Sequence, residues 1–361
     1  MRIGLAYNQR PELIGESSPL RLRQSADPIT TDRYVEWDTP ETIAAVEAAL
    51  GVFGDVVRLE AVGDFAARLR AARVDLLFNM AEGLSGPCRE SHVPAIAEFL
   101  GVPYTASDPL TLALALHKGR AKEILAFRGV PTPAFVVVES PRDLARLDAL
   151  PYPAFLKPVW EGSSKGIAMD NHVIGPDGAH ERALHLLETY AQPVLAEAYL
   201  PGDEFTVAVL GNGPETSCLP LIRYRFDALP AGALPIMGYE AKWLWDTEGG
   251  PLGDVLECPA RVDASMAQRI EEVALAAYGA LGCRDWARVD VRLNAAGAPQ
   301  VLEINPLPGI IPDPTQHSCF PAAAAAAGLS YAELIQTVVR VAWKRLSGRE
   351  LEVPALAGAA A

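Results

Sequence analysis

Two short β-like runs near the end of the chain constrain the fold more than any other stretch. Residues Ala287–Leu293 and Gln300–Asn305 alternate in polarity, and a Gly/Asn/Pro segment separates them, which predicts a β-hairpin. If the hairpin is centred on that segment, direct pairing places Asp290 opposite Glu303. Alternation turns Leu302 to the opposite face. Two carboxylates then face each other on one surface of a sheet.

The same pairing places Arg288 opposite Asn305, and alternation puts Arg292 on this face as well. Acids that face each other without a partner repel, and a divalent cation between them relieves the repulsion. We therefore interpret Asp290, Glu303 and Asn305 as oxygen ligands of Mg²⁺ or Mn²⁺. The alternative is an exposed hairpin whose polar face is solvated.

The composition limits the class of protein. With 361 residues, 50% of them hydrophobic and 21% charged, the chain fits a packed globular protein of two or three lobes. Its net charge of −14 argues against a general nucleic-acid surface, so any phosphate site must be local. The N-terminal apolar run is too short for a signal peptide, no apolar stretch has the length of a membrane span, and the cysteines lack metal-binding spacing. We expect a cytoplasmic protein that binds neither nucleic acid nor membrane.

The first part of the chain alternates strand and helix patterns, which is typical of a parallel sheet. Ligands of such sheets bind beyond the carboxyl ends of the strands, where the loops Asn8–Asp38 and Asn79–His92 are expected. The first loop is long enough to indicate a functional or mobile segment. We expect strands at Arg2–Tyr7, Asp55–Leu59 and Val74–Asn79, and helices at Thr39–Leu50, with Asp38 as N-cap, and at Asp64–Ala72.

Both kinds of pattern continue along the chain without an internal repeat. Residues 228–257 are rich in Gly, Pro and Trp and indicate a long covering loop, whereas the alanine run Ala322–Ala327 is expected to be helical. A frayed tail is expected from about Ser347. Further strands are expected at Ala134–Val138, Pro151–Pro158, Val194–Leu200 and Glu204–Leu210, and helices at Lys118–Arg128, Ala179–Tyr190, Ala264–Leu281 and Tyr331–Leu346.

A Gly/Ser loop follows a lysine at the end of an apolar strand. Lys157 precedes Pro158, and the sequence EGSSKG occupies positions 161–166. Small residues let backbone N–H groups approach an anion, so this loop, with Ser163 and Ser164 at its centre, suits nucleotide phosphates while Lys157 supplies charge. The spacing is not that of a P-loop, and a plain hairpin turn is an equal alternative.

Two acids flank the next strand connection. Glu197 and Glu204 lie on either side of a Pro-Gly turn, which suits a crevice where the backbone near Leu200 reads a base edge and an acid binds ribose hydroxyls. Lys242, in the covering loop, is a candidate cation for closure over phosphates. Surface acids at strand ends and loop lysines without a ligand are the common alternatives.

Successive motifs carry a resemblance to a known family. KPVWEGSSKG, EAYLPGDEFTVAVL, YEAKW, LGCRDWARVDVRL, LEINPLPG and HSCFPAAAAAAGLSYAELI resemble, in order, the motifs of the D-alanine:D-alanine ligases, members of the ATP-grasp superfamily. The similarity runs from about Gly101 to Lys344, with weaker likeness back to Arg2. It implies an α/β (α+β) ATP-grasp fold with an N-terminal parallel α/β preATP-grasp lobe at 1–116, ATP-clamping lobes at 117–200 and 201–348, and a flexible tail at 349–361.

The resemblance also implies cofactors, chemistry and residue roles. ATP and Mg²⁺ (or Mn²⁺) are the implied cofactors, amino acids or peptides the implied substrates, and a homodimer the suggested assembly. The γ-phosphoryl group would pass to a substrate carboxylate, and an amine would then displace phosphate from the acyl phosphate. The matching positions are Lys118 and Lys157 (phosphates), Ser163 (loop serine, beside Ser164), Glu197 (adenine hinge, with Leu200), Glu204 (ribose), Lys242 (closure), Asp290, Glu303 and Asn305 (Mg²⁺), and Arg288 (reacting carbonyl).

The substrate end departs from the family pattern. Only Glu36 and Glu41 are candidates for the acid that holds the first amino acid's ammonium, and Glu82 stands in place of the family's histidine. The loop after the hairpin is a few residues longer than in the family. The candidate substrate-binding residues are Glu36, Glu82, Gly309, His317 and Ser318.

Changes on both sides of the reaction centre indicate that one or both substrates differ from free D-alanine. We therefore expect a specialised amino-acid or peptide ligase, with a cell-wall D-alanine:D-alanine ligase as the alternative. A non-catalytic ATP-binding regulator is an alternative of another class. It is disfavoured because the three expected metal ligands and Arg288 are all present.

Overall fold

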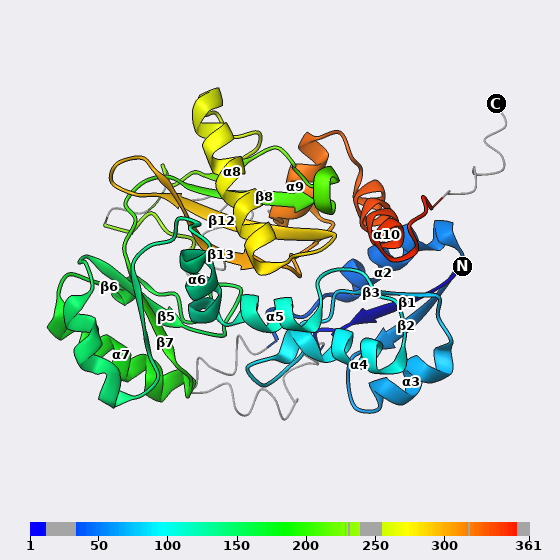
Figure 1. Cartoon of the computed structure of the whole chain (residues 1–361), viewed down its shortest axis with the longest axis horizontal. Helices are drawn as coiled ribbons and strands as arrows, with labels where there is room; N and C mark the ends of the chain where they lie inside the picture. Colours follow the sequence, from blue (N-terminus) through cyan, green and yellow to red (C-terminus); the bar gives the residue numbers. More distant parts are fainter. Residues whose placement is uncertain (12–33, 228, 230–231, 239–254, 317, 352–361) are drawn as a thin grey trace, which may run out of the picture.

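Three sheets with their helices make up the framework of the computed structural model (Figure 1). The structure describes residues 1–11, 34–227, 229, 232–238, 255–316 and 318–351. Lys242, His317, most of the first long loop and part of the covering loop lie outside these described residues. Within them, no single helix is long and apolar enough to cross a membrane. The helix pair Cys319–Ala326 and Tyr331–Ser347 has enough length and apolar residues only when taken together, and the two helices meet at an angle of 97°.

The N-terminal lobe holds a parallel sheet of order β2-β1-β3, as the sequence predicts. Helix α2 begins at Pro40, and the Thr39 side chain accepts the N–H of Thr42, so the prediction that Asp38 caps this helix is wrong by one residue. The elements of this lobe are β1 (Arg2–Tyr7), α2 (Pro40–Leu50), β2 (Asp55–Glu60), α3 (Phe65–Ala72), β3 (Leu76–Asn79), α4 (His92–Leu100) and α5 (Pro109–Leu116).

The central lobe holds an antiparallel sheet of order β4-β7-β5-β6. Helix α7 packs on this sheet. Helix α6 lies between the central sheet and the sheet of the C-terminal lobe (Figure 1). A side chain on α6 can therefore reach both sheets. The elements are α6 (Lys118–Phe127), β4 (Phe135–Val138), β5 (Ala154–Pro158), β6 (His172–Val173), α7 (Pro176–Tyr190) and β7 (Val194–Ala198).

The C-terminal lobe is built on a sheet of order β11-β10-β8-β12-β13, with β9 paired to β8. Helix α8 covers one face of this sheet, and α9 and α10 lie on the side of the N-terminal lobe (Figure 1). The elements are β8 (Glu204–Leu210), β9 (Ser217–Cys218), β10 (Ile222–Tyr224), β11 (Leu256–Glu257), α8 (Ala264–Leu281), β12 (Trp286–Leu293), β13 (Pro299–Asn305), α9 (Cys319–Ala326) and α10 (Tyr331–Ser347).

The hairpin β12–β13 has the predicted register at its functional end. Asp290 pairs directly with Glu303. The register then shifts, and Val291 pairs with Val301, which leaves Leu302 as the extra residue of a β-bulge. Leu302 lines the pocket beside Glu303, so the prediction that it turns away is wrong because the bulge re-aims its side chain.

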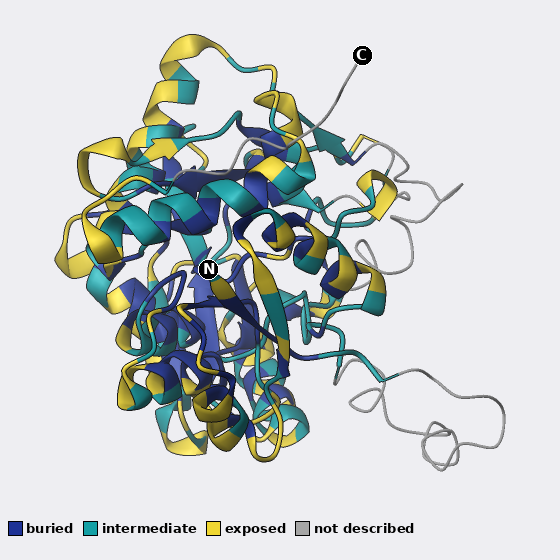
Figure 2. Cartoon of the chain, turned by 90° about the vertical axis from the view of Figure 1, so that its right-hand side faces the viewer, coloured by how far each residue is buried: buried dark blue, intermediate teal, exposed yellow. Residues whose placement is uncertain are grey.

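The two faces of the C-terminal sheet serve different purposes. Val289 and Val291 pack with α8 in a core of this lobe. On the other face, Trp286 is 1% exposed, and its ring lies 5.9 Å from Phe78 of the N-terminal lobe and 5.4 Å from Phe320 of α9, between ring centroids. The inner strands are accordingly buried, while the outer faces of the helices are exposed (Figure 2). The polar residues of β12 continue along the face that carries Trp286.

Candidate active site

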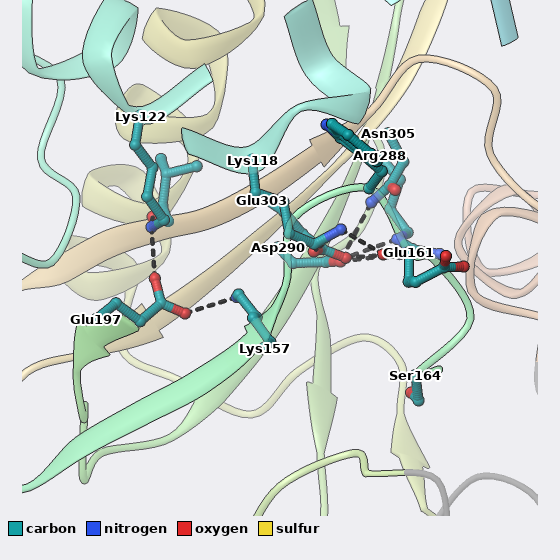
Figure 3. A network of polar contacts seen from close by, with 12 residues as sticks. Lys118, Lys122, Lys157, Glu161, Ser164, Glu197, Arg288, Asp290, Glu303 and Asn305 are labelled. Carbon is teal, nitrogen blue, oxygen red and sulfur yellow. Dashed lines mark hydrogen bonds and ion pairs between the residues drawn. The ribbon is translucent and has the colours of Figure 1, made fainter. Parts of the chain in front are cut away.

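The paired acids of the hairpin are held by one arginine (Figure 3). Arg288 donates from Nε to Asp290 Oδ1 at 3.0 Å and from Nη2 to Asp290 Oδ2 at 2.9 Å. The same Nη2 lies 3.8 Å from Glu303 Oε1. Burial lowers the pKa of Arg288, but Asp290, Tyr224 and Cys319 together outweigh burial and raise the pKa, so this guanidinium stays charged at every ordinary pH.

Further donors reach Asp290 from neighbouring strands. The hydroxyl of Thr206 on β8 donates to Asp290 Oδ1, and the amide of Asn305 on β13 donates to Oδ2 at 3.4 Å. The structure thus brings the three predicted metal ligands together. Thr206 was missed by the sequence analysis, although it shares its strand face with Glu204 and is the direct partner of Asp290.

Lys118 connects helix α6 to the hairpin. Its Nζ lies 3.4 Å from Glu303 Oε2 and donates to the backbone oxygen of Glu161 at 2.5 Å. Burial raises the pKa of Glu303, but Lys118, Lys157 and Arg288 outweigh burial and lower it to about 2. Glu303 is therefore a carboxylate at neutral pH.

A second charged cluster lies on the central lobe, where Glu197 stands between two lysines (Figure 3). Lys157 Nζ lies 2.6 Å from Glu197 Oε1, and Lys122 Nζ lies 2.7 Å from Oε2. Burial raises the pKa of Glu197, but the two lysines outweigh it and the net shift is downward. Lys122 was not predicted as a site residue, although it follows Lys118 by one helical turn.

Glu204 and Leu200 line the same pocket as Glu197. Arg292 Nη1 donates to Glu204 Oε2 at 2.7 Å, and its Nη2 donates to the backbone oxygen of Pro235 at 2.7 Å. Burial raises the pKa of Glu204, an effect that Arg292 partly offsets. Arg292 was placed on the correct strand face by alternation but was given no role.

The loop of residues 161–166, called the serine loop below, has an unusual backbone. Ser163 and Ser164 have φ values of 49° and 60°, and Gly166 has 70°, so successive residues adopt the left-handed region. Ser164 Oγ donates to the backbone oxygen of Met237 at 2.8 Å. Ser163 and Ser164 line the pocket opposite the hairpin acids, together with Gly162.

The predicted ammonium-binding acid is already bound to two cations. Arg89 Nη2 donates to both Glu36 oxygens, at 3.0 and 3.1 Å, and Lys165 Nζ donates to Oε2 at 2.8 Å. Arg89 Nη1 also donates to the backbone oxygen of Trp160 at 2.7 Å. Glu36 thus joins the N-terminal lobe to the serine loop. Neither Arg89 nor Lys165 was predicted as a partner of Glu36, because nothing in the local sequence marks a contact between segments this far apart.

Two further acids lie close to Glu36 and Arg89. Burial raises the pKa of Glu90 to about 7, with Arg89 opposing and Glu36 adding to the effect. Burial and the neighbouring Glu90 and Glu36 also raise the pKa of Glu82 well above its usual range. This side of the site is therefore rich in carboxyl groups that resist ionisation.

The loop after the hairpin is closed by one serine. Ser318 Oγ donates to the backbone oxygen of Gly309 at 3.1 Å and accepts the N–H of Ile311 at 3.2 Å. This loop lies directly beyond Asn305, as predicted. Neither His317 nor Lys242 belongs to the part of the chain that the structure describes.

Comparisons with solved structures show which fold the chain adopts. A D-alanine–D-alanine ligase from Bacillus anthracis superposes with a TM-score of 0.69 at 24% identity and covers 96% of this chain and 98% of its own. A structure of the Bacillus anthracis enzyme complexed with ATP gives 0.67 at 21% identity, with coverage of 97% and 100%. The fold is therefore that of the ATP-grasp proteins, as the resemblance implied.

Sequence comparisons then identify the family. Residues 124–340 match the family model described as D-ala D-ala ligase C-terminus. The D-alanine–D-alanine ligase of Methylobacterium radiotolerans is 34% identical over 82% of this chain and 90% of its own length. An uncharacterized protein of Sinorhizobium fredii, y4sG, is 37% identical over 76% of each chain. The chain belongs to the D-alanine–D-alanine ligase family, which confirms the expected class of ATP-dependent carboxylate–amine ligases.

Proposed function

We propose that this protein uses ATP and Mg²⁺ to join the carboxylate of an amino acid or short peptide to an amine. The arrangement that carries the proposal is the pair Asp290 and Glu303, bridged by Arg288 in a pocket that also holds Lys118 and Lys157. Carboxylates, a fixed guanidinium and buried lysines are the groups that phosphoryl transfer to a carboxylate requires. Family membership supports the same reaction and the same cofactors.

Asp290, Glu303 and Asn305 fit Mg²⁺ by the chemistry of their donors. They offer two carboxylates and an amide oxygen, and such hard oxygen ligands suit this ion. Among the described residues, no cluster of three or more His, Cys, Asp or Glu side chains is placed to hold a metal. The third proposed ligand is therefore an amide, that of Asn305, and not a third acid. When bound, Mg²⁺ would offset the negative charge of the phosphates.

The remaining residues would position the reactants and stabilise charge. Lys118 and Lys157 would face the phosphates, and Glu204 the ribose. The γ-phosphoryl group would move to a substrate carboxylate oxygen to give an acyl phosphate and ADP. An amine that has lost a proton would then attack the acyl carbon, and Arg288 would stabilise the resulting oxyanion until phosphate leaves.

The substrate side supports a ligase specialised for something other than two free D-alanine molecules. Glu36 is bound by Arg89 and Lys165, and Glu82 lies where the family's histidine is expected. Glu82 and Glu90 are hard to ionise in the empty site. A cationic amine nearby would favour their ionised form and would in turn be bound by it. We therefore propose that the amine of a substrate lies next to Glu82 and Glu90.

The alternative is that the protein joins two D-alanine molecules. The names of relatives favour it, since the Bordetella avium protein, 36% identical over 75% of this chain and 79% of its own length, is a D-alanine–D-alanine ligase.

Phosphate release distinguishes these possibilities. The protein is incubated with Mg·ATP and with pools of D- and L-amino acids and dipeptides, and active pools are divided until single substrates remain. The proposal predicts release that requires a substrate other than D-alanine. Rapid release with D-alanine alone would support the alternative, and ATP binding without turnover on any pool would contradict both.

A further inference from the structure

Lys122 is a buried cation that does not line the pocket. Its side chain is 1% exposed, and the pocket wall in front of it is formed by Glu197 and Lys157. Its Nζ lies 2.7 Å from Glu197 Oε2 and donates to Thr132 Oγ1 at 2.9 Å. Burying an ammonium group without a partner costs free energy, so its contacts should account for its position.

The charges of this cluster do not cancel. Glu197 carries one negative charge, and Lys122 and Lys157 each carry a positive one, so one positive charge remains. Lys122 meets Glu197 from behind the pocket wall, whereas Lys157 lies in the wall itself (Figure 3). The charge that remains is therefore presented to the pocket through Lys157. Without Lys122, Glu197 would instead neutralise Lys157.

We infer that Lys122 is a positioning residue that neutralises Glu197 from behind and so keeps the charge of Lys157 available to the phosphates of a nucleotide. This inference rests on the proposed use of ATP. Lys122 itself does not line the pocket, and no role was predicted for it from the sequence.

The position of Lys122 on α6 connects this cluster to the hairpin. Its Nζ donates to the backbone oxygen of Val301 at 3.4 Å, two residues before Glu303 on β13. Lys118, one turn earlier on the same helix, lies 3.4 Å from Glu303. The two lysines therefore hold Glu197 and Glu303 in a fixed relation, although these acids belong to different sheets.

The charged groups around Lys122 agree with this role. Burial lowers its pKa to about 8, Glu197 opposes this shift, and Lys157 adds to it, with Glu303 as a further acid nearby. Burial lowers the pKa of Lys157, but Glu197, Glu303 and Glu204 together outweigh burial, and the net shift is upward. Of the two lysines, Lys122 is thus the one that loses its proton first when the pH rises.

The test compares wild type, Lys122→Met, the double variant Lys122→Met with Glu197→Gln, and the exposed control Lys344→Met. Calorimetry at pH 7 measures the Kd of ATP and of tripolyphosphate, which has the phosphates but no base, and thermal unfolding without ligand checks each fold. Lys122→Met should weaken tripolyphosphate binding by about tenfold or more, because Glu197 then neutralises Lys157. The double variant should recover tripolyphosphate binding to within about threefold of wild type, but not ATP binding, since Glu197 is the acid expected beside the adenine base.

Each result decides the inference separately from the proposed function. If wild type does not bind ATP, the proposed function fails. If wild type binds ATP and a folded Lys122→Met binds tripolyphosphate equally well, the inference is wrong. A merely structural Lys122 would lower the unfolding temperature without changing the Kd of tripolyphosphate for the folded variant. Should Lys122→Met not fold, the double variant carries the test, and loss of tripolyphosphate binding there would overturn the inference.

Discussion

Asp290 and Glu303 are direct partners across the β12–β13 hairpin, and Leu302 bulges out immediately beside them. Replacing Glu303 with Gln keeps the shape of the side chain but removes one charge from this pair. We expect turnover to fall by about a hundredfold or more, because the proposed metal site loses a carboxylate. Phosphate release with the best substrate measures this effect. Glu272→Gln, on the exposed side of α8, is the matched control, and full activity of Glu303→Gln would refute the proposed mechanism.

Arg288 is expected to act on the reaction rather than on nucleotide binding. Its guanidinium contacts Asp290 and Glu303 and keeps its charge. Arg288→Met should lower kcat by about a hundredfold to a thousandfold, the usual cost of losing a donor to a developing oxyanion. The Kd for ATP should change much less. The exposed Arg225→Met serves as the control, and a variant that lost ATP affinity but kept kcat would contradict this assignment.

Gly162 lies against the acid that joins two lobes. A Cβ added at this position would overlap the Glu36 carboxylate and push it away from Arg89 and Lys165. Gly162→Ala should lower kcat/KM by about tenfold, because the serine loop loses its tie to the N-terminal lobe. Gly178→Ala, where an added Cβ meets ordinary contacts, is the control and should not lower activity. Equal kinetics for both variants would mean that the Glu36 contacts do not matter for the reaction.

Asp285 connects the N-terminal and C-terminal lobes and is 0% exposed. It accepts two hydrogen bonds from Arg345, each at 2.8 Å, one from the N–H of Ala106 at 2.8 Å and one from Asn212 at 2.8 Å. Asp285→Asn should lower the free energy of unfolding by about 3–5 kcal/mol, since Arg345 loses its buried partner. Urea unfolding measures this change.

The control for that prediction is another aspartate–arginine pair at the surface. Asp227 and Arg225 are both exposed. Asp227→Asn should change the free energy of unfolding by less than about 1 kcal/mol. Similar losses for the two variants would show that burial does not determine the strength of these pairs.

The titration of Asp38 should make the free energy of unfolding depend on pH. Burial raises its pKa to about 8, although Arg10 lowers it in part. In the unfolded chain this carboxyl group titrates near pH ~4, so between these values the folded protein binds more protons than the unfolded chain. The stability that protonated Asp38 contributes is therefore present below pH ~4 and is lost as the pH rises through about 8.

Asp38→Asn removes this titration. The free energy of unfolding of the variant minus that of wild type should be larger at pH 8 than at pH 5, because only wild type loses stability as Asp38 ionises. Urea unfolding at both pH values measures the difference. If the two proteins kept a constant difference in unfolding free energy between pH 5 and pH 8, the raised pKa of Asp38 would be wrong.

Local patterns were sufficient for most of the framework and for half of the hairpin. Alternation and a turn segment define which residues face each other, so Asp290 was placed opposite Glu303 from the sequence. The bulge at Leu302 was not predicted, because no residue type in this run requires one. The cap of α2 was misplaced because Asp38 and Thr39 are both good capping residues in adjacent positions.

Contacts between distant segments account for what the sequence could not show. Glu36 looks like a free acid in its own segment, and only the fold brings Arg89 and Lys165 to it. Lys122 offered a usable signal, since it follows Lys118 at the spacing of one helical turn. Its buried contact with Glu197 nevertheless depends on how α6 meets the central sheet.

Trp286 begins the strand that carries Arg288 and Asp290, and its ring packs between Phe78 and Phe320. The lengthwise position of β12 is therefore anchored by an aromatic contact with the N-terminal lobe, four residues before Asp290. A fragment without that lobe would expose this indole to water and release the strand from its anchor. The nucleotide-clamping part of this protein is thus not a self-sufficient module that can be cut out and attached to a different substrate lobe.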